Sequence, residues 1–356
     1  HVAVPVLQVV TDSATASHIA SVKNTYSILG NGKLAVNLIK AKQGPATVFE
    51  EKIDFNKYDT SGNLVEQQKI NDIKSVYFWD YKSSYPVAVI NNADSASVAF
   101  TSFEAENNGN WSYTGSPLDT VAITGKKAYR LNGSNAVSRS GLNSGVVYFI
   151  TYWTRNNAAF SVGGTQSGYP IAGKTINGWK FYVHKITGQS SVSISGTGLI
   201  DEVRLYPEFA LFKTFTYAPL LGITSECDEN NRIVYYEYDG FGRLSIIRDE
   251  NKNVLRRIRY HYNGQQESTT YYYNVAINQN FTRNNCGSGY TGSSVTYTVA
   301  ANTYSSDISQ ADANKKASND ITGNGQYYAN VTGSCTAACN TSTCSGLDKR
   351  CVFGSC

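Results

Sequence analysis

Apolar and polar residues alternate with a period of two along much of the first 98 residues. The runs at 33–39 and 76–79 show this pattern, and clusters rich in Gly and Asn at 30–32 and 61–63 separate such runs. Alternation places the apolar side chains on one face of a strand, and Gly-Asn clusters are typical of hairpin turns. We therefore expect residues 1–98 to form an antiparallel β-sheet.

Short apolar runs recur roughly every 8 to 12 residues between 99 and 207, a spacing typical of a β-sandwich. These runs lie at 127–131, 146–153, 179–184, 191–195 and 200–206. Residues 208–265 are again strand-like. The sequence thus predicts a sandwich flanked on both sides by sheet segments.

The stretch that begins near Ser309 is the good candidate for a helix. Ser309 and Asp312 approximate a capping box, and Ala317 and Ile321 belong to a weak apolar stripe. Gly323 is expected to end this helix. We therefore expect a small α+β domain at 266–335, followed by a Cys-rich tail at 336–356, in a chain that is mainly β.

Composition supports a β-rich chain and excludes two classes of protein. Only 16% of the residues are charged, and the 26 Tyr and 30 Gly are abundant. The sequence contains no apolar run long enough for a membrane span and no basic block of the kind that binds nucleic acid. Because the chain opens on His1 and contains no Met, we expect it to be a processed product or a segment of a longer protein.

Six of the seven cysteines are concentrated near the C-terminus. Cys227 stands alone and is expected to be a small buried side chain. The spacings of the others include no Cys-x2-Cys pair and no nearby His, so disulfides are favoured over zinc and indicate an oxidising compartment. These six are Cys286, Cys335, Cys339, Cys344, Cys351 and Cys356.

A repeated motif connects the two sheet segments. Tyr58-Asp59-x-x-Gly62-Asn63-Leu64 matches Tyr238-Asp239-x-x-Gly242-Arg243-Leu244. Asp and Gly suit a tight turn between two strands. The motif resembles the YD repeat of Rhs-type proteins, which implies a β-sheet scaffold in secreted or surface-exposed bacterial proteins. The sandwich lies between the two copies, so we interpret it as an insertion between neighbouring repeats.

The middle segment is similar to jelly-roll modules of the carbohydrate-binding kind. The resemblance depends on Glu104, on Gly109-Asn-Trp111, on the aromatic residues at 148–153 and on Ile200-Asp201. It implies that Glu104 and Asp201 help to hold a structural calcium ion, which requires several oxygen ligands. The alternative is that both carboxylates face solvent. No other cofactor is expected.

Residues 271–335 resemble a small domain of unknown function that follows YD segments in outer-surface proteins of gliding-type bacteria. The residues that carry this resemblance include Phe281, Cys286, Asn314 and Cys335. It implies a bridge between Cys286 and Cys335, and export by a type nine secretion route. The pairing of the four later cysteines stays open.

Three motifs that suggest catalysis are better explained by structure. Residues 168–175 satisfy the Walker A pattern, but Asn177-Gly178 and a strand follow where a helix would be needed. His184 lies in an apolar strand, which favours a structural role. Asp201 and Glu202 are neighbours on a strand, so we expect their side chains to point to opposite faces and not to act as a catalytic pair.

Aromatic residues of the sandwich offer a candidate platform for sugar rings. Trp153 and Trp179 lie in apolar strands and are expected in the core. Trp111 lies in a polar turn and stays open between core and platform. Tyr113 and Tyr169 are expected to widen the binding surface.

Together these features predict a non-catalytic structural or adhesion protein, extracellular or on the bacterial outer surface. Its sandwich is the candidate for binding a glycan or a surface protein, without nucleic acid or membrane span, within a larger surface assembly. Two alternatives stay open: a fragment of an Rhs-type toxin-delivery shell, and an extracellular filament or coat subunit.

Overall fold

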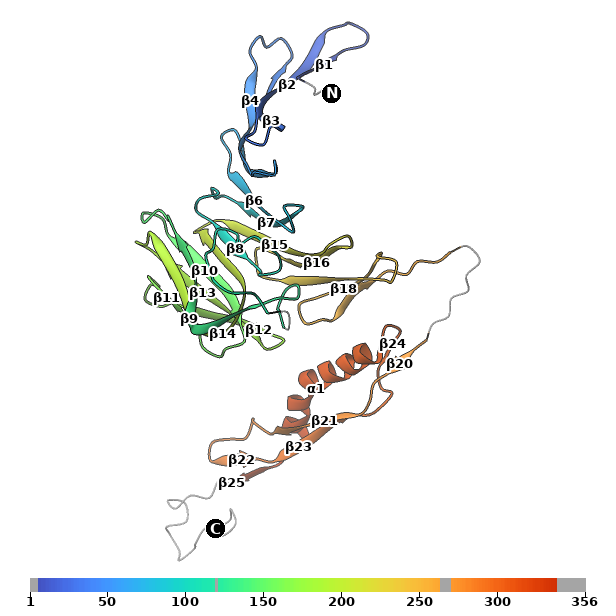
Figure 1. The fold of residues 1–356 in the computed structure, drawn as a ribbon. Helices are drawn as coiled ribbons and strands as arrows, with labels where there is room; N and C mark the ends of the chain where they lie inside the picture. The colour runs from blue at the N-terminus through green and yellow to red at the C-terminus, as the bar shows by residue number, and fades with distance from the viewer. Residues whose placement is uncertain (1–5, 119–120, 263–269, 338–356) are drawn as a thin grey trace, which may run out of the picture. The chain divides into compact units, whose positions relative to one another are not determined.

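The structure, a computed structural model, describes residues 6–118, 121–262 and 270–337. The chain divides into two compact units, His1–Arg259 and Tyr260–Cys356. Strands predominate, and the helix α1 (Gln310–Thr332) lies with short strands in the second unit (Figure 1). The expectation of a mainly β chain with a small C-terminal α+β region is confirmed.

The first unit contains a twelve-stranded antiparallel sheet in which neighbouring strands are consecutive in the chain, except for β7 and β15. Hydrophobic alternation and short turns favour this up-and-down arrangement, because a hairpin is the shortest connection between antiparallel strands. Its strands, in order across the sheet, are β1 (Leu7–Thr11), β2 (His18–Ile28), β3 (Leu34–Gln43), β4 (Glu50–Tyr58), β5 (Leu64–Lys69), β6 (Lys74–Asp80), β7 (Tyr85–Asn91), β15 (Leu211–Ala218), β16 (Gly222–Cys227), β17 (Ile233–Tyr238), β18 (Leu244–Arg248) and β19 (Val254–Arg257).

The sheet is continuous in space although it is interrupted in sequence. The chain leaves the sheet after β7 and returns in β15, which pairs directly with β7 from Leu211 opposite Asn91 to Thr214 opposite Ala88. The two sheet segments therefore form one surface, and the strands between them branch off it as a second body.

One turn geometry recurs along the sheet, and we call it the Asp turn. Its first residue is Asp, whose Oδ1 accepts the backbone N–H of the fifth residue at 2.8 or 2.9 Å. The backbone N–H of the Asp donates to the carbonyl of that fifth residue, which closes the loop. The Asp turns span residues 59–63, 228–232, 239–243 and 249–253.

The fourth residue of each Asp turn has a positive φ, between 58° and 91°. Gly meets this requirement without strain in two of the four turns, and Asn231 and Lys252 meet it in the others. Sequence matching finds the two Gly-containing turns readily, whereas the turn at 228–232 has no Gly and shares only its first and fifth residues with the turn at 239–243.

Seven strands form the inserted body, and the long strand β14 connects its parts. β14 pairs with β8, β9, β10 and β11, with bulges that let it bend. Side chains such as Leu131, Ile150 and Ile194 form its core. The strands are β8 (Ala99–Thr101), β9 (Tyr129–Ser140), β10 (Tyr148–Thr154), β11 (Ser161–Val162), β12 (Ile171–Ile176), β13 (Trp179–Ile186) and β14 (Ser191–Pro207).

A second apolar core joins the inserted body to the sheet, and we call it the junction core. Trp153, Trp179 and Phe181 of the insertion pack with Cys227 and Ile233 of the sheet. Because one set of buried side chains belongs to both bodies, neither can rotate without exposing apolar surface. The insertion is therefore fixed rigidly on the sheet.

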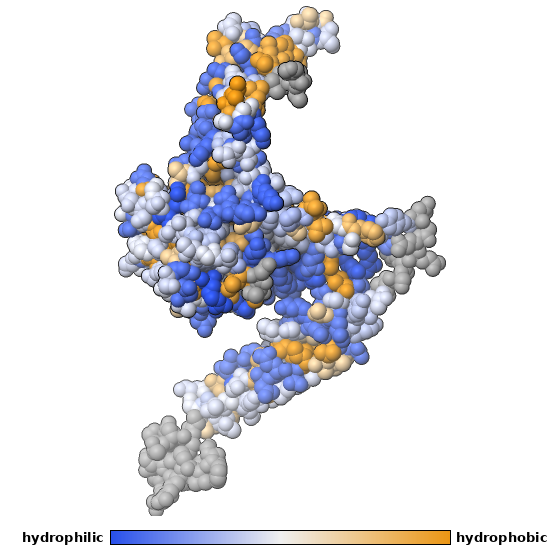
Figure 2. Space-filling view, viewed as in Figure 1, coloured by the Kyte–Doolittle hydropathy of each residue, from blue (hydrophilic) through white to orange (hydrophobic). Residues whose placement is uncertain are grey.

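The beginning of the sheet has no covering layer among the described residues. Ser21 is the one buried residue of strands β1 to β4, and Leu7, Val9 and Ile28 are exposed. Apolar side chains are visible on this part of the surface (Figure 2). Exposed apolar surface on both faces of a sheet is typical of a segment that contacts other protein in the functional assembly.

In the second unit, α1 lies along the hairpin of β21 (Ile277–Thr282) and β23 (Ser294–Val299) (Figure 1). Ile277, Phe281 and Tyr297 face the helix, while the opposite face of the hairpin is polar. Short pairs extend the hairpin at its ends, formed by β20 (Tyr272–Tyr273) with β24 (Ser305–Ser306) and by β22 (Tyr290–Gly292) with β25 (Cys335–Ala337).

The start of α1 is as expected, but its end is not. Ser309 is the N-cap, and its hydroxyl oxygen accepts the N–H of Asp312 at 3.2 Å. The expected stop at Gly323 is wrong, since the helix continues for nine residues to Thr332. Gly325 and Ala329 are buried against the hairpin, so tertiary packing extends the helix through a weak helix former.

Two glycines of α1 provide a prediction with opposite signs. A Cβ at Gly325 would lie 2.1 Å from the Phe281 ring, whereas a Cβ at Gly323 would meet no atom within 4 Å. Gly323→Ala is therefore expected to stabilise the second unit by up to about 1 kcal/mol, and Gly325→Ala to destabilise it by about 1–3 kcal/mol. Hydrogen exchange of the α1 amides in the full chain measures both, and equal protection in the two variants would contradict the packing.

Candidate functional site

The tryptophans of the inserted body are buried. Trp153 and Trp179 lie in the junction core, in agreement with their expected role. Of the two roles left open for Trp111, the structure shows the core one and not the ligand platform, because only 3% of its surface is exposed and its Nε1 donates to the Val203 carbonyl at 3.2 Å. The turn that contains Trp111 has a polar sequence, yet it places this side chain in the core of the inserted body.

The two tyrosines differ in their surroundings. Tyr113 is half-buried, and its ring contacts Phe103 and Tyr129 with centroids 5.2 Å away in each case. Tyr169 is half-exposed beside Phe149, 6.4 Å between ring centroids. Neither joins an aromatic platform with Trp111.

Glu104 and Asp201 both bind the loop at 123–127. Asp201 is fully buried, and its Oδ2 accepts the N–H of Ile123 at 2.9 Å. Glu104 Oε1 accepts the N–H of Lys126 at 2.7 Å. The structure thus brings together the two carboxylates that the resemblance links, and backbone amides approach both of them.

Burial, together with the negative charges of Glu202 and Glu104, raises the pKa of the Asp201 carboxyl well above its ordinary value. A cation held by the carboxylates would offset this repulsion. Asp201 Oδ2 and Glu104 Oε1 each already accept two backbone N–H groups, which a cation would have to share. Among the described residues, no three His, Cys, Asp or Glu side chains gather where they could hold a metal. The two carboxylates would therefore need backbone carbonyls or water as further ligands.

The expectation that Asp201 and Glu202 point to opposite faces is wrong. Both accept hydrogen bonds from Thr124, whose N–H donates to Asp201 at 3.3 Å and whose hydroxyl donates to Glu202 Oε1 at 2.7 Å. Glu202 has a φ of 51° and sits where the pairing of β14 with β10 shifts register. This bulge turns two neighbouring carboxylates toward one loop.

Glu202 is also part of a buried ionic network at the junction of the two bodies. Arg204 Nη2 lies 3.0 Å from Glu202 Oε2, and the two side chains are 3% and 1% exposed. Thr214 of the sheet donates to the same carboxylate oxygen at 2.9 Å, and Arg204 Nη1 donates to Asn231 at 3.0 Å. The network connects β14 to the sheet through charge-assisted bonds.

Cys227 lies beside this network and is a free, fully buried thiol. Burial raises the pKa of Cys227 to about 12, so the thiol stays protonated at neutral pH. Its position in the junction core agrees with the expected role as a small buried side chain.

His184 is held inside the inserted body by two side chains. The Thr165 hydroxyl donates to the Val162 carbonyl, so its oxygen accepts from His184 Nδ1 at 2.9 Å. His184 Nε2 is then the acceptor for the Tyr152 hydroxyl at 3.0 Å. Burial lowers the pKa of His184 to about 4, so the imidazole is neutral and structural.

This burial predicts a pH dependence of stability. The unfolded His184 takes up a proton below its ordinary pKa of about 6.5, while the folded one stays neutral until about 4. The unfolded state then binds more protons, so the free energy of unfolding is expected to fall by about 3 kcal/mol between pH 6.5 and 4. Urea unfolding at several pH values measures this, and His184→Gln should flatten the slope between pH 5 and 6.5. An unchanged slope in that variant would contradict the assignment.

The Walker A pattern forms no nucleotide loop. Residues Ile171–Ile176 are β12, and Asn177-Gly178 turns the chain into β13. Lys174 forms an ion pair with Glu250 of the sheet. The pattern is thus part of a hairpin, as its flanking residues indicate.

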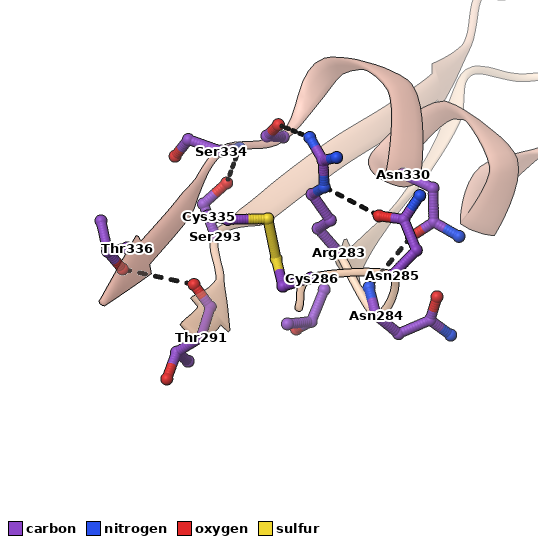
Figure 3. The surroundings of a disulfide bond; sticks show 12 residues. Arg283, Asn284, Asn285, Cys286, Thr291, Ser293, Asn330, Ser334, Cys335 and Thr336 are labelled. Carbon is purple, nitrogen blue, oxygen red and sulfur yellow. Dashed lines mark hydrogen bonds between the residues drawn. A yellow bond between two sulfur atoms is a disulfide. The ribbon is translucent and has the colours of Figure 1, made fainter. Parts of the chain in front are cut away.

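In the second unit, Cys286 and Cys335 form a disulfide across a sequence separation of 49 residues (Figure 3). Arg283 lies beside it and donates to the Gly333 carbonyl at 2.7 Å, at the end of α1. The N–H of Ser334 donates to the Ser293 hydroxyl at 2.8 Å. The other expected disulfide residues, Cys339, Cys344, Cys351 and Cys356, lie outside the described residues.

The second unit contains the part of the chain that matches a protein-family model. Residues 272–336 match a family of unknown function, DUF5977. The matched range contains α1, the β21–β23 hairpin and both cysteines of the disulfide. A comparison of the chain with curated proteins finds no match. The relationship therefore concerns the second unit and assigns it no activity.

Proposed function

We propose that this chain is a non-catalytic structural or adhesion protein in which a β-sheet scaffold presents a glycan-binding sandwich. The observation that carries the proposal is the pairing of β7 with β15, which makes one sheet out of two sequence segments and leaves the insertion projecting from it. The junction core then holds the insertion in a constant orientation. A rigid support for a projecting module suits adhesion, since binding then needs no reordering of the module.

The proposed location is extracellular, on a bacterial outer surface reached by type nine secretion. The Cys286–Cys335 disulfide supports an oxidising compartment. The Asp turns support the resemblance to YD repeats, because the hydrogen bonds of the motif recur at 228–232 and 249–253. No helix in the described part of the chain combines the length and apolar character that crossing a bilayer requires.

Participation in a larger surface assembly is a further part of the proposal. It is supported by strands β1 to β4, where apolar side chains such as Leu7, Val9 and Ile28 are exposed. Such surface is expected to be covered by other protein in the working state.

Binding of the full chain to a glycan array tests the proposed function. We expect the chain to bind a subset of the glycans. As a control against aggregated protein, a sample that has been heated and refolded, and cleared of aggregates, should bind the same subset. Absence of binding to every glycan at micromolar concentration would reject the glycan-binding part and leave a structural role.

The calcium ion is proposed as a stabilising ligand of Glu104 and Asp201. Calcium added after chelation is expected to raise the unfolding temperature by several degrees, because it removes the repulsion between the two carboxylates. Calorimetry of the full chain with calcium, with magnesium and with chelator measures this. Glu104→Gln should reduce the calcium effect, and identical unfolding temperatures in all three conditions would reject the site.

A further inference from the structure

A cleft of about 710 Å³ opens in the first unit between the β12–β13 hairpin and two Asp turns of the sheet. Lys174 and Phe181 line it from the insertion. The Asp turns at 228–232 and 249–253 line it from the sheet, together with Leu255 of β19. None of the residues that the sequence suggests for ligand binding lies here.

The walls of the cleft are fixed. Phe181 and Ile233 belong to the junction core and are buried. The ion pair of Lys174 with Glu250, and the bond from Asn177 Nδ2 to the Glu250 carbonyl at 3.1 Å, connect the hairpin to the turn at 249–253. The cleft is therefore preformed, as small-ligand sites usually are.

Arg232 differs from the residues at the same position in the other Asp turns. In those turns the fifth side chain donates back to the first Asp, with distances of 3.1 Å for Asn63 Nδ2, 2.8 Å for Arg243 Nε and 2.9 Å for Asn253 Nδ2. The guanidinium of Arg232 makes no hydrogen bond or ion pair within the described ranges, and it lines the cleft. The Asp turn at 228–232 is therefore the one of the four described whose fifth side chain does not bond its Asp, and this side chain lines the cleft.

Two amides and an apolar surface accompany the guanidinium. The side chains of Asn230 and Asn251 line the cleft, and neither amide has a side-chain partner among the residues with described positions. Leu255 is 61% exposed and adds apolar surface to the lining. Lys174 forms an ion pair with Glu250. The other carboxylate of the lining, Asp249, accepts hydrogen bonds from its own turn, so Arg232 is the lining cation without an ion pair among the described residues.

We propose that this cleft binds an acidic sugar residue of a polysaccharide. The planar guanidinium of Arg232 matches a carboxylate with two parallel hydrogen bonds. The amides of Asn230 and Asn251 bond sugar hydroxyls, and the C–H face of the ring lies on Leu255. A neutral sugar would leave the guanidinium without a counter-charge, which favours a uronate. This assignment is based on the proposed glycan binding and specifies its place and its ligand class.

The test compares polygalacturonate with the same polymer after full methyl esterification, which converts each carboxylate to a neutral methyl ester and leaves the sugar hydroxyls unchanged. Affinity electrophoresis and calorimetry of the full chain at two salt concentrations measure binding. We expect polygalacturonate to retain the chain, and the affinity for the esterified polymer to be lower by a factor of about ten or more. Arg232→Ala should cause a similar loss, and Arg232→Lys a partial one.

Arg130→Ala is the matched control, since Arg130 is exposed on β9, lies outside the cleft and changes the net charge equally. It should bind as the unaltered chain does. Equal losses in both Ala variants, or equal retention by dextran sulfate, would attribute binding to net charge and overturn the cleft assignment. Preference for neutral glycans would overturn the cleft assignment while keeping the proposed glycan binding. Failure to bind any glycan would reject both the cleft assignment and the glycan-binding part of the proposed function. Binding of peptide C-termini in place of the uronate would also overturn it.

Discussion

Arg204→Met is expected to lower the free energy of unfolding of the first unit by about 3–5 kcal/mol. The substitution removes the partner of Glu202, whose side chain is 1% exposed and would remain as a buried charge. Thr214 and Thr124 would then be its remaining side-chain donors. Urea unfolding of the full chain, monitored by hydrogen exchange in β14 and β15, measures the loss.

The double variant Glu202→Gln with Arg204→Met separates the ion pair from packing. Without the buried charge, the double variant should recover a large part of the stability that the single variant loses. If Arg204→Met alone were as stable as the unaltered chain, the buried network would not connect the insertion to the sheet. If the double variant had a lower free energy of unfolding than Arg204→Met alone, side-chain volume and shape at this position would matter more than charge.

Loss of the Cys286–Cys335 disulfide is expected to destabilise the second unit by about 4 kcal/mol. The bond closes a sequence separation of 49 residues, and its removal restores that loop entropy to the unfolded chain. The double variant Cys286→Ser with Cys335→Ser leaves no unpaired thiol at this position. Hydrogen exchange of the α1 amides in the full chain measures the effect.

The β10 amides of the first unit provide the internal control for this variant, because β10 belongs to the other compact unit. Their protection should not change. Undiminished protection of α1 would show that Arg283 and the surrounding hydrogen bonds hold the end of the helix without the disulfide.

Much of the strand content could be predicted from the sequence, because alternation and turn residues act locally. The motif at Asp59 and Asp239 predicts a turn, and both positions form one. The equivalent turn at Asp228 was missed, although Asp228, Asp239 and Asp249 follow one another at intervals of 11 and 10 residues. A search for Asp followed four residues later by Asn or Arg finds all four, and also Asp320 with Asn324 inside α1.

Predictions from the sequence were wrong or left open where contacts with a segment distant in the chain determine the local structure. Trp111 lies in a polar turn, yet the core of the inserted body covers it. Glu202 breaks the alternation of β14 because a bulge satisfies a buried network that includes Thr214 and Asn231. Gly323 does not end α1, because the hairpin binds the next two turns of the helix.

By itself, the sequence determined the period of the strands, the polar corners between them and the cap of the helix, since each depends on residues a few positions apart. Only the tertiary structure decided that β7 pairs with β15, that two carboxylates face one loop and that Arg232 lines a cleft. These features join segments separated by tens of residues or more, where the free energy of burial and pairing outweighs local preference.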